Sequence, residues 1–441
     1  MSHVLRGGYE NLFRLYFQAA AGLPPRRLLD RVTGKCRSSG SSGLSRETQL
    51  RAARCPGKTP PGQLRPPLLT GAERVPGGRT GQQRGRTRAG RGRRAGAPGA
   101  GGAGRGRRRR AAAVRMERAA GMLTCWGAAL GAAVSVPVLL LVAAPYVRRY
   151  VAGGLCKSTA KLEGKVAVIT GANTGIGKET ARDLARRGAR VIIACRDIAK
   201  AEAAAREIRA ETGNQQVIVK KLDLADTKSI REFAEKFLAE EKELHILINN
   251  AGVMLCPYSK TADGFEMHLG VNHLGHFLLT FLLLERLKQS APARIVNVSS
   301  LAHHGGRIRF HDLHGEKSYN RGLAYCHSKL ANVLFTRELA RRLQGTKVTA
   351  NALHPGSVHS ELVRHSFVMT WLWKIFSFFL KTPWEGAQTS VYCAVAEELD
   401  SVTGQYFSDC QPAYVSPRGR DDETAKKLWN VSCELLGIQW D

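Results

Sequence analysis

The chain has 441 residues, enough for two or three average domains, with 43% hydrophobic and 23% charged residues and a formal net charge of +31. Its ten cysteines are scattered, without a CxxC pair or a Cys/His spacing that suits zinc. This usage argues against a zinc site and against a disulfide framework, and it indicates reduced thiols in a protein that faces the cytosol.

The first quarter of the chain carries most of the positive charge. Residues 1–115 hold 26 Lys and Arg against 4 Asp and Glu, whereas the remaining residues hold 41 against 32. Arg, Gly, Pro, Ala and Ser dominate this stretch, which cannot bury enough apolar surface to offset its ordering entropy, so we expect it to be disordered. It can be interpreted as an arm that binds RNA or anionic lipid, as a solvated tail, or as sequence upstream of a start at Met116 or Met122. We favour the last interpretation and expect no nucleic-acid partner.

A run without charged residues follows at 119–147 and ends at Arg148 and Arg149. Its length suits a single membrane-spanning helix, which needs about 20 apolar residues, and exceeds the ~7–15-residue core of a cleaved signal peptide, the alternative. If the chain starts at Met122, the basic residues after the helix place the rest of the chain in the cytosol. A basic tail in the native protein would oppose that orientation.

From Gly164 onward, apolar strands alternate with segments of helical length. Strands are expected at 166–170, 190–195, 216–222, 245–249, 294–299 and 348–353, and the first helices at 177–187 and 198–212. Apolar strands separated by helices indicate a parallel sheet covered on both faces. The sequence therefore predicts a single doubly wound α/β domain of the Rossmann type over residues 161–441.

A glycine-rich turn lies between the first strand and the first helix of this domain. Glycines allow a tight turn and let backbone N–H groups approach a pyrophosphate, and the N-terminus of a helix attracts negative charge. The spacing Gly-x-x-x-Gly-x-Gly resembles that of the short-chain dehydrogenase/reductase family. The residues expected to bind a dinucleotide here are Gly171, Ala172, Asn173, Thr174, Gly175, Ile176 and Gly177.

The end of the second strand indicates which dinucleotide is bound. An NAD enzyme would place a carboxylate there to accept from the ribose hydroxyl, whereas this chain places Arg196 there. A guanidinium suits a 2′-phosphate through paired, charge-assisted hydrogen bonds, so we expect NADP(H). In the alternative, Asp197 is the ribose carboxylate, Arg196 is solvated and the cofactor is NAD(H).

A Tyr-x-x-x-Lys pattern places Tyr325 and Lys329 on one face of an expected helix. A phenol with a pKa of about 10 is a poor acid–base group at neutral pH, and an adjacent ammonium lowers that pKa. We therefore expect Tyr325 to exchange a proton with a carbonyl or alcohol oxygen while hydride passes to or from the nicotinamide.

No metal is needed for this reaction. The histidines, including His303, His304, His311 and His314, lack ligand spacing and are expected in loops or on the surface.

The family resemblance implies roles for further residues. It assigns Ser300 to the substrate oxygen and Asn272 to a water in a proton relay that reaches Lys329. The remaining cofactor contacts that it implies are Asp223, Leu224, Asn250, Ala251, Gly252, Tyr325, Lys329, Pro355, Gly356 and Ser360.

Residues 367–380 hold six aromatic side chains in fourteen positions, where these enzymes carry the segment that covers the substrate. This segment is interpretable as the lining of a pocket for a long lipophilic substrate, as a surface that dips into the membrane interface, or as core packing. The first two interpretations are compatible, because a membrane-borne substrate would enter from the bilayer.

The chain from Gly153 onward resembles the microsomal retinol dehydrogenase subgroup of the family. The resemblance implies NADPH-dependent reduction of all-trans-retinal and other lipid aldehydes at the endoplasmic reticulum membrane, with a single-pass anchor and the catalytic domain in the cytosol. One alternative is a steroid or fatty-aldehyde reductase of the same fold. Another is a non-catalytic protein that binds nucleic acid or membrane, against which the complete set of Asn272, Ser300, Tyr325 and Lys329 argues. The sequence does not indicate the number of subunits.

Overall fold

The computed structural model describes residues 142–363 and 377–440, with shorter pieces at 110, 113–118, 120–122 and 371. The chain divides into two compact units, Met1–Thr33 with Ser135–Asp441, and Gly34–Val134. In the second unit, residues 113–118 are helical and exposed, and they include the last three residues of the predicted basic tail. Most of that tail and of the predicted anchor at 119–147 lie outside the described residues, so both stay predictions.

The first unit is built on an eight-stranded sheet with the order β3-β2-β1-β4-β5-β6-β7-β8. Seven strands pair in parallel, and β8 pairs antiparallel to β7. The strands are β1 (Val166–Thr170), β2 (Arg190–Cys195), β3 (Val217–Lys221), β4 (Ile246–Asn249), β5 (Ala293–Val298), β6 (Val348–Leu353), β7 (Tyr406–Ser408) and β8 (Gln411–Pro412). The predicted doubly wound α/β domain is confirmed.

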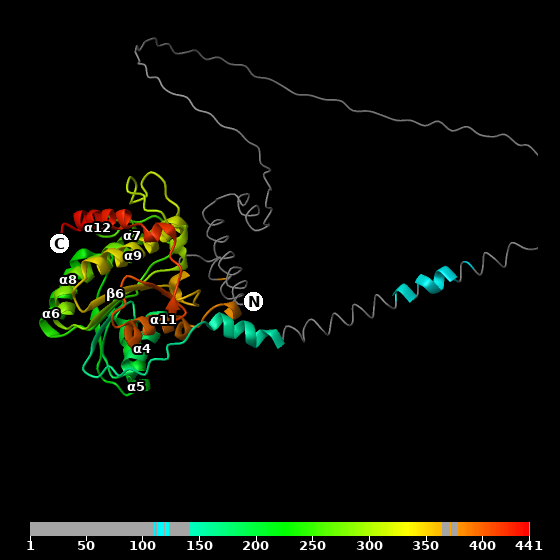
Figure 1. The fold of residues 1–441 in the computed structure, drawn as a ribbon, viewed down its shortest axis with the longest axis horizontal. Helices are drawn as coiled ribbons and strands as arrows, with labels where there is room; N and C mark the ends of the chain where they lie inside the picture. Colours follow the sequence, from blue (N-terminus) through cyan, green and yellow to red (C-terminus); the bar gives the residue numbers. More distant parts are fainter. Residues whose placement is uncertain are drawn as a thin grey trace, which may run out of the picture. The chain divides into compact units, whose positions relative to one another are not determined.

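Helices cover both faces of this sheet (Figure 1). They are α4 (Gly175–Arg186), α5 (Ile198–Thr212), α6 (Thr227–Glu240), α7 (Met267–Leu269), η2 (Gly270–Leu274), α8 (Gly275–Gln289), η3 (Leu301–Gly305), α9 (Arg321–Arg342), η4 (Glu361–Val363), η5 (Ser377–Phe379), α11 (Pro383–Val395), η6 (Glu397–Leu399), η7 (Pro417–Arg420) and α12 (Asp422–Leu436). Residues 142–152 form a further helix before the sheet.

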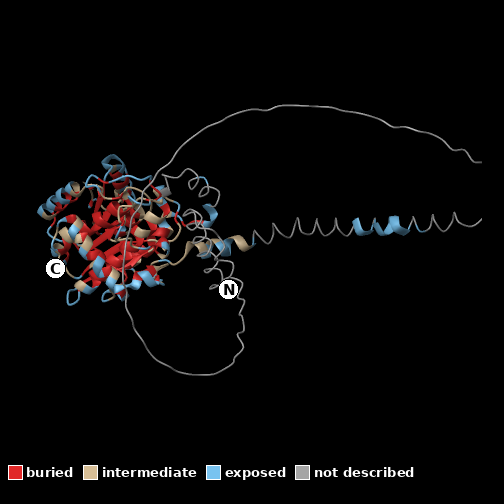
Figure 2. Ribbon diagram, turned by 90° about the horizontal axis from the view of Figure 1, so that it is seen from above, coloured by how far each residue is buried: buried red, intermediate tan, exposed pale blue. Residues whose placement is uncertain are grey.

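Alternate side chains of each strand enter two separate hydrophobic cores. In β1, Val168 packs with α6, α8, α9 and α12, whereas Ala167 and Ile169 pack with α4, α5 and α11. All five residues of β1 are buried, as expected for a parallel strand with helices on both sides. Figure 2 shows the buried residues concentrated in the sheet and on the helix faces that touch it.

One long helix, Met267–Gln289, combines α7, η2 and α8. Among the described residues, this is the helix that is long and apolar enough, by length and composition, to cross a membrane. However, 83% of its apolar window is buried inside the protein. Burial on this scale identifies it as a core helix. Its π-helical segment, η2, contains Asn272, and such segments occur frequently at functional sites.

The strand order fixes where a ligand can bind. The chain crosses from β3 back past β1 to β4, so the connections after β1 and β4 diverge to opposite sides of the sheet. In open α/β sheets, the crevice at this switch point, beside the carboxyl ends of the strands, is the general ligand site. The glycine-rich turn follows β1 and Asn250 follows β4, so both lie at this edge.

Candidate active site

A cavity of about 410 Å³ opens at the carboxyl edge of the sheet, and most of the residues expected from the sequence line it. Those that do so are Gly171, Asn173, Thr174, Gly175, Ile176, Gly177, Arg196, Asp223, Leu224, Asn250, Ala251, Gly252, Ser300, Tyr325, Lys329, Pro355, Gly356 and Ser360. Two expected residues are not among its lining. Ala172 is fully buried beneath the turn, and Asn272 lies behind the cavity wall.

The turn after β1 has the backbone geometry that a dinucleotide requires. Gly171 and Gly175 have φ angles of 66° and 57°, in the left-handed region that favours glycine. A Cβ at Gly177 would lie 2.5 Å from the amide nitrogen of Asn250, so this glycine permits close packing of α4 against the loop after β4. The turn leads directly into the N-terminus of α4, where an anion is stabilised by the helix dipole. The cradle therefore fits the pyrophosphate of a dinucleotide.

The residues after β2 separate the two interpretations of Arg196 and Asp197. The Asp197 carboxylate caps α5 by accepting a hydrogen bond of 3.0 Å from the backbone N–H of Lys200. Arg196 is exposed at the cavity, and Lys200 also lines it. This wall of the cavity presents the cationic side chains of Arg196 and Lys200 together with the carboxylates of Asp197 and Glu361, and Lys200 Nζ lies 3.7 Å from Glu361 Oε2.

The loop after β4 is held to β1 through the hydroxyl of Thr170. Both backbone N–H groups of Asn250 and Ala251 donate to Thr170 Oγ1 at 2.9 Å. The buried ring of His276 lies between Thr170 Oγ1 at 2.9 Å and the carbonyl oxygen of Asn272 at 3.1 Å. Because a carbonyl only accepts, His276 Nδ1 donates to it, and Nε2 accepts from the Thr170 hydroxyl. Burial, the largest effect, lowers the pKa of His276 to about 4, consistent with this neutral form.

Tyr325 is buried, with 3% of its surface exposed, and its side chain is hydrogen-bonded to Ser300. Burial raises the pKa of the phenol above its ordinary value, and the hydrogen bond to Ser300 opposes that rise. Ser300 itself caps η3, where its hydroxyl accepts from the N–H of Ala302. At neutral pH the Tyr325 hydroxyl is therefore protonated and lies beside a second hydroxyl at the cavity wall.

The side chain of Lys329 lies beside the Tyr325 ring, but its ammonium group points to the backbone at the end of β5. Its ammonium nitrogen is 5.8 Å from the ring centre and donates to the carbonyl oxygen of Val298 at 2.9 Å. Burial lowers the pKa of Lys329 to about 8. For the phenol of Tyr325, burial is the largest effect and raises the pKa, and the hydrogen bond to Ser300 lowers it; the lowering by Lys329 that the sequence predicts stays a prediction.

The side chain of Asn272 contacts Val253 and Ser328, and the water relay that the family resemblance implies for it stays a prediction. Its side-chain oxygen accepts from Val253 N at 2.8 Å, and its amide nitrogen lies 3.0 Å from Val253 O and 2.9 Å from Ser328 Oγ. The side chain therefore fastens the loop after Gly252 to the core helix. A Cβ built on Gly252 would lie 3.3 Å from Asn272 Oδ1 and 3.6 Å from Lys329 Nζ, so both side chains flank this glycine.

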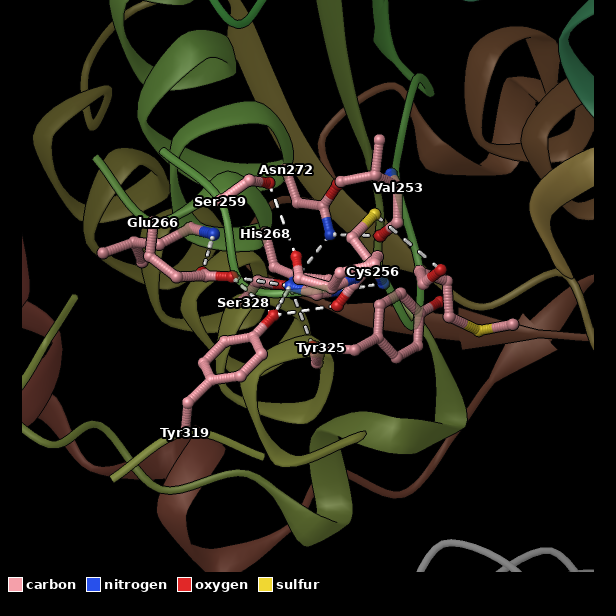
Figure 3. A network of polar contacts seen from close by, with 12 residues as sticks. Val253, Cys256, Ser259, Glu266, His268, Asn272, Tyr319, Tyr325 and Ser328 are labelled. Carbon is pink, nitrogen blue, oxygen red and sulfur yellow. Dashed lines mark hydrogen bonds and ion pairs between the residues drawn. The ribbon is translucent and has the colours of Figure 1, made fainter. Parts of the chain in front are cut away.

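The apolar end of the cavity was missed by sequence reasoning. Its lining includes Val253, Met254, Leu255, Met267, Val271 and Leu362. Met254 and Leu255 follow the expected Asn250-Ala251-Gly252 directly, and that position next to the cofactor motif was the one signal that could have indicated them. Figure 3 shows the polar contacts around this loop and Tyr325.

The histidine prediction needs a correction. His303 is completely buried in η3, where its ring contacts Tyr406 and its Nε2 accepts from Ser416 N. The absence of ligand spacing does not imply exposure, because a buried histidine can satisfy neighbouring backbone groups, as His303 does. Among the described residues there is no group of three or more His, Cys, Asp or Glu side chains that could hold a metal ion.

The aromatic segment at 367–380 lies largely outside the described residues. In the part that is described, Trp371, Phe378 and Phe379 are 56%, 42% and 44% exposed. Exposure of this extent excludes core packing for these three side chains. The pocket-lining and membrane-interface interpretations of the segment stay predictions.

Comparison with known proteins identifies close relatives. Residues 165–369 match the family model described as short chain dehydrogenase. Retinol dehydrogenase 12 of Bos taurus is 70% identical over 312 residues, which cover 71% of this chain and 99% of that protein. Retinol dehydrogenase 11 of Homo sapiens is 67% identical over 69% of this chain and 96% of its own length. An uncharacterized protein from Mycobacterium paratuberculosis, solved by crystallography, is 40% identical with a TM-score of 0.55, covering 66% of this chain and 99% of that one.

Proposed function

The chain belongs to the short-chain dehydrogenase/reductase family of oxidoreductases, and from that premise we propose that it transfers hydride between NADP(H) and the carbonyl or alcohol carbon of a retinoid. The observation that carries this proposal is the pairing of the Tyr325 and Ser300 hydroxyls in a cavity with a dinucleotide cradle at one end and an apolar wall at the other. The relatives named retinol dehydrogenase support the choice of a retinoid.

The residues of the chain supply the position of the substrate and a proton. The nicotinamide, when bound, supplies or accepts the hydride. In the reducing direction, the protonated Tyr325 hydroxyl donates to the substrate oxygen, and the Ser300 hydroxyl holds that oxygen in place. Lys329, cationic below its pKa of about 8, offsets the negative charge left on the phenol. In the oxidising direction, the same groups act in reverse.

Two observations support NADP(H) over NAD(H). Arg196 and Lys200 both line the cavity after β2, where the adenosine ribose of a dinucleotide lies in folds of this class. Asp197 also lines the cavity, but one of its carboxylate oxygens already accepts from the backbone of α5. A 2′-phosphate would pair with the guanidinium of Arg196 through charge-assisted hydrogen bonds.

A lipophilic substrate is supported by the opposite end of the cavity. Met254 and Leu255 are buried, 5% and 3% exposed, and pack in one cluster with Tyr325. An apolar wall beside the proton donor suits a carbonyl at the end of a hydrocarbon chain, such as all-trans-retinal or another lipid aldehyde.

We also propose that the catalytic domain is held at the endoplasmic reticulum membrane, facing the cytosol. The helix at 142–152 overlaps the last residues of the predicted anchor, 142–147, and its Arg148 donates to both carboxylate oxygens of Glu385 at 2.6 and 2.7 Å. Tyr146 on this helix and Trp384 next to Glu385 are 74% and 46% exposed. Aromatic side chains of this kind favour the membrane–water interface, which supports a domain attached close to the bilayer.

One experiment tests substrate and location together. Cells producing the full chain are separated into membranes and supernatant, and each is assayed with NADPH and all-trans-retinal, a steroid ketone or a medium-chain aldehyde. We expect the activity in the membranes, with all-trans-retinal as the best substrate. Preference for the steroid ketone would favour the alternative reductase, and activity confined to the supernatant would contradict the membrane proposal.

The reduction should slow as the pH rises through about 8. Burial lowers the pKa of Lys329 to about 8, so its positive charge is present below that pH and is lost above it. Burial raises the pKa of Tyr325, so the phenol stays protonated over the same range and does not cause the decline. The measurement is kcat/KM for reduction between about pH 6 and 10. A variant at an exposed lysine, Lys347→Met, should keep the decline, and a profile that stays level to about pH 9.5 would contradict the assignment.

A further inference from the structure

A short loop forms the apolar wall beside Tyr325, and it is held by side chains at both of its ends. This wall loop, residues 253–256, leaves the cofactor motif at Gly252 and carries Met254 and Leu255 into the cavity. At its first end, the backbone N–H and C=O of Val253 are both bonded to the side chain of Asn272. The loop contains no helix or strand, so its shape depends on such contacts.

The second end of the wall loop, Cys256, is held by the buried ring of His268 and the half-buried ring of Tyr319. The N–H of Cys256 donates to His268 Nε2 at 3.2 Å, and the Tyr319 hydroxyl donates to the carbonyl oxygen of Cys256 at 3.0 Å. Both backbone groups of Cys256 therefore have side-chain partners, as at Val253. Figure 3 shows Tyr319 and His268 directed toward Cys256 from one side, with Tyr325 beyond them.

Glu266 fixes the orientation of His268. Because the N–H of Cys256 can only donate, His268 Nε2 accepts, and the ring hydrogen is on Nδ1, which donates to Glu266 Oε1 at 2.6 Å. The other carboxylate oxygen accepts from Leu269 N at 2.8 Å. Glu266 and His268 are 3% and 0% exposed, so this pair is shielded from water. The ring of His268 also meets that of Tyr325 edge-on, with centres 6.3 Å apart.

The backbone within the wall loop needs this support. Leu255 has a φ of 56°, a left-handed conformation that a residue with a branched side chain seldom adopts. Such a conformation persists where the surroundings enforce it, and it occurs often at ligand sites. With both ends held, Leu255 is kept buried against Tyr325 and Met254 in one cluster.

We propose that Glu266, His268 and Tyr319 are positioning residues that hold Met254 and Leu255 as the wall against which the hydrocarbon chain of the substrate lies, and so set the preference for long lipophilic carbonyl compounds. The inference rests on the proposed oxidoreductase function and identifies the side chains that determine its substrate class. The wall contacts the chain of the substrate and not its reacting carbon. It therefore contributes the same binding energy before and during reaction, which affects KM more than kcat.

The test uses Tyr319→Phe, which removes one hydroxyl and leaves the ring in place. The probes are decanal and butanal, compared as the ratio of their kcat/KM values in the full chain with NADPH. Loss of one hydrogen bond to the wall loop should lower this ratio about five- to tenfold, through a higher KM for decanal, while kcat and the values for butanal stay nearly unchanged. Tyr258→Phe, which removes an exposed hydroxyl from the ring next to Tyr319, is the matched control and should leave the ratio unchanged.

A double-mutant cycle shows whether Tyr319 acts through the wall. Leu255→Ala shortens the wall and should itself lower the ratio, and adding Tyr319→Phe should then lower it little further. Additive effects would overturn the proposal. So would an equal loss for decanal and butanal, because that result would mean that Tyr319 supports Tyr325 and not the wall.

Hydrogen exchange gives a readout that does not depend on turnover. Peptides covering residues 253–257 should exchange faster in Tyr319→Phe than in the unchanged chain or in Tyr258→Phe, and unchanged exchange would overturn the proposal. Failure of the unchanged chain to reduce all-trans-retinal would refute the retinoid assignment alone, since the decanal-to-butanal ratio and the exchange data still decide the role of Tyr319.

Discussion

Replacing Tyr325 with Phe should lower the turnover of the carbonyl substrate by about 100- to 10,000-fold, the usual contribution of a positioned proton donor. The substitution removes one oxygen atom from a buried ring that packs with Met254, Leu255 and Ala302, so the apolar cluster is kept. The affinity for NADPH should change by no more than about twofold, because the glycine cradle and Arg196 are untouched. Steady-state kinetics and titration of cofactor fluorescence measure the two quantities.

The control for Tyr325→Phe is Tyr258→Phe, at a tyrosine whose side chain is 44% exposed. It should keep full turnover. If Tyr325→Phe retained more than about a tenth of the activity, the proton would have to come from another group, and Tyr325 would lose its proposed role. Loss of cofactor binding in the same variant would instead indicate that the phenol supports the cradle.

Replacing Arg196 with Asp should reverse the cofactor preference. The substitution removes a cation from the cavity wall and places a carboxylate where a 2′-phosphate would lie, while Lys200 remains. Loss of charge-assisted hydrogen bonds together with repulsion should lower the ratio of kcat/KM for NADPH to that for NADH by about 100-fold or more. The ratio is measured with one carbonyl substrate at a fixed concentration.

Arg206→Asp on α5 is the matched control for Arg196→Asp, since it makes the same change of charge at an exposed position outside the cavity lining. It should leave the ratio within about twofold, because an exposed charge at a distance is screened by salt. An unchanged ratio in Arg196→Asp would show that Arg196 does not contact the phosphate, and it would return Asp197 to consideration as the ribose ligand.

The sheet could be predicted closely from the sequence because its strands are buried on both faces. The bounds of β1, β2 and β6 agree with the expected ones residue for residue, as do those of α5. A strand between two helical layers is a continuous apolar run, and in β1 all five residues are buried. The short β7 and β8 were not predicted, since three and two residues give no period to recognise.

The cofactor end of the cavity could also be predicted, because its residues lie in short motifs at the ends of recognisable strands. The wall loop could not. The φ of Leu255 and the contacts of Cys256 with His268 and Tyr319 arise from residues 12 and 63 positions apart, which no local pattern reveals. The direction of the Lys329 ammonium depends on the carbonyl of Val298, which a Tyr-x-x-x-Lys pattern does not specify.

The junction between the helix at 142–152 and the catalytic domain has a practical consequence for making soluble fragments. Arg148 contacts Glu385, and Gly154 packs closely on Asp409. A Cβ added to Gly154 would lie 1.9 Å from the backbone carbonyl oxygen of Asp409. Asp409 in turn pairs with Lys381, whose side chain packs on Gly356 in the cavity lining. A fragment trimmed to the first strand would therefore lose the contacts of Arg148 with Glu385 and of Gly154 with Asp409, so truncations intended for crystallisation should begin before Arg148.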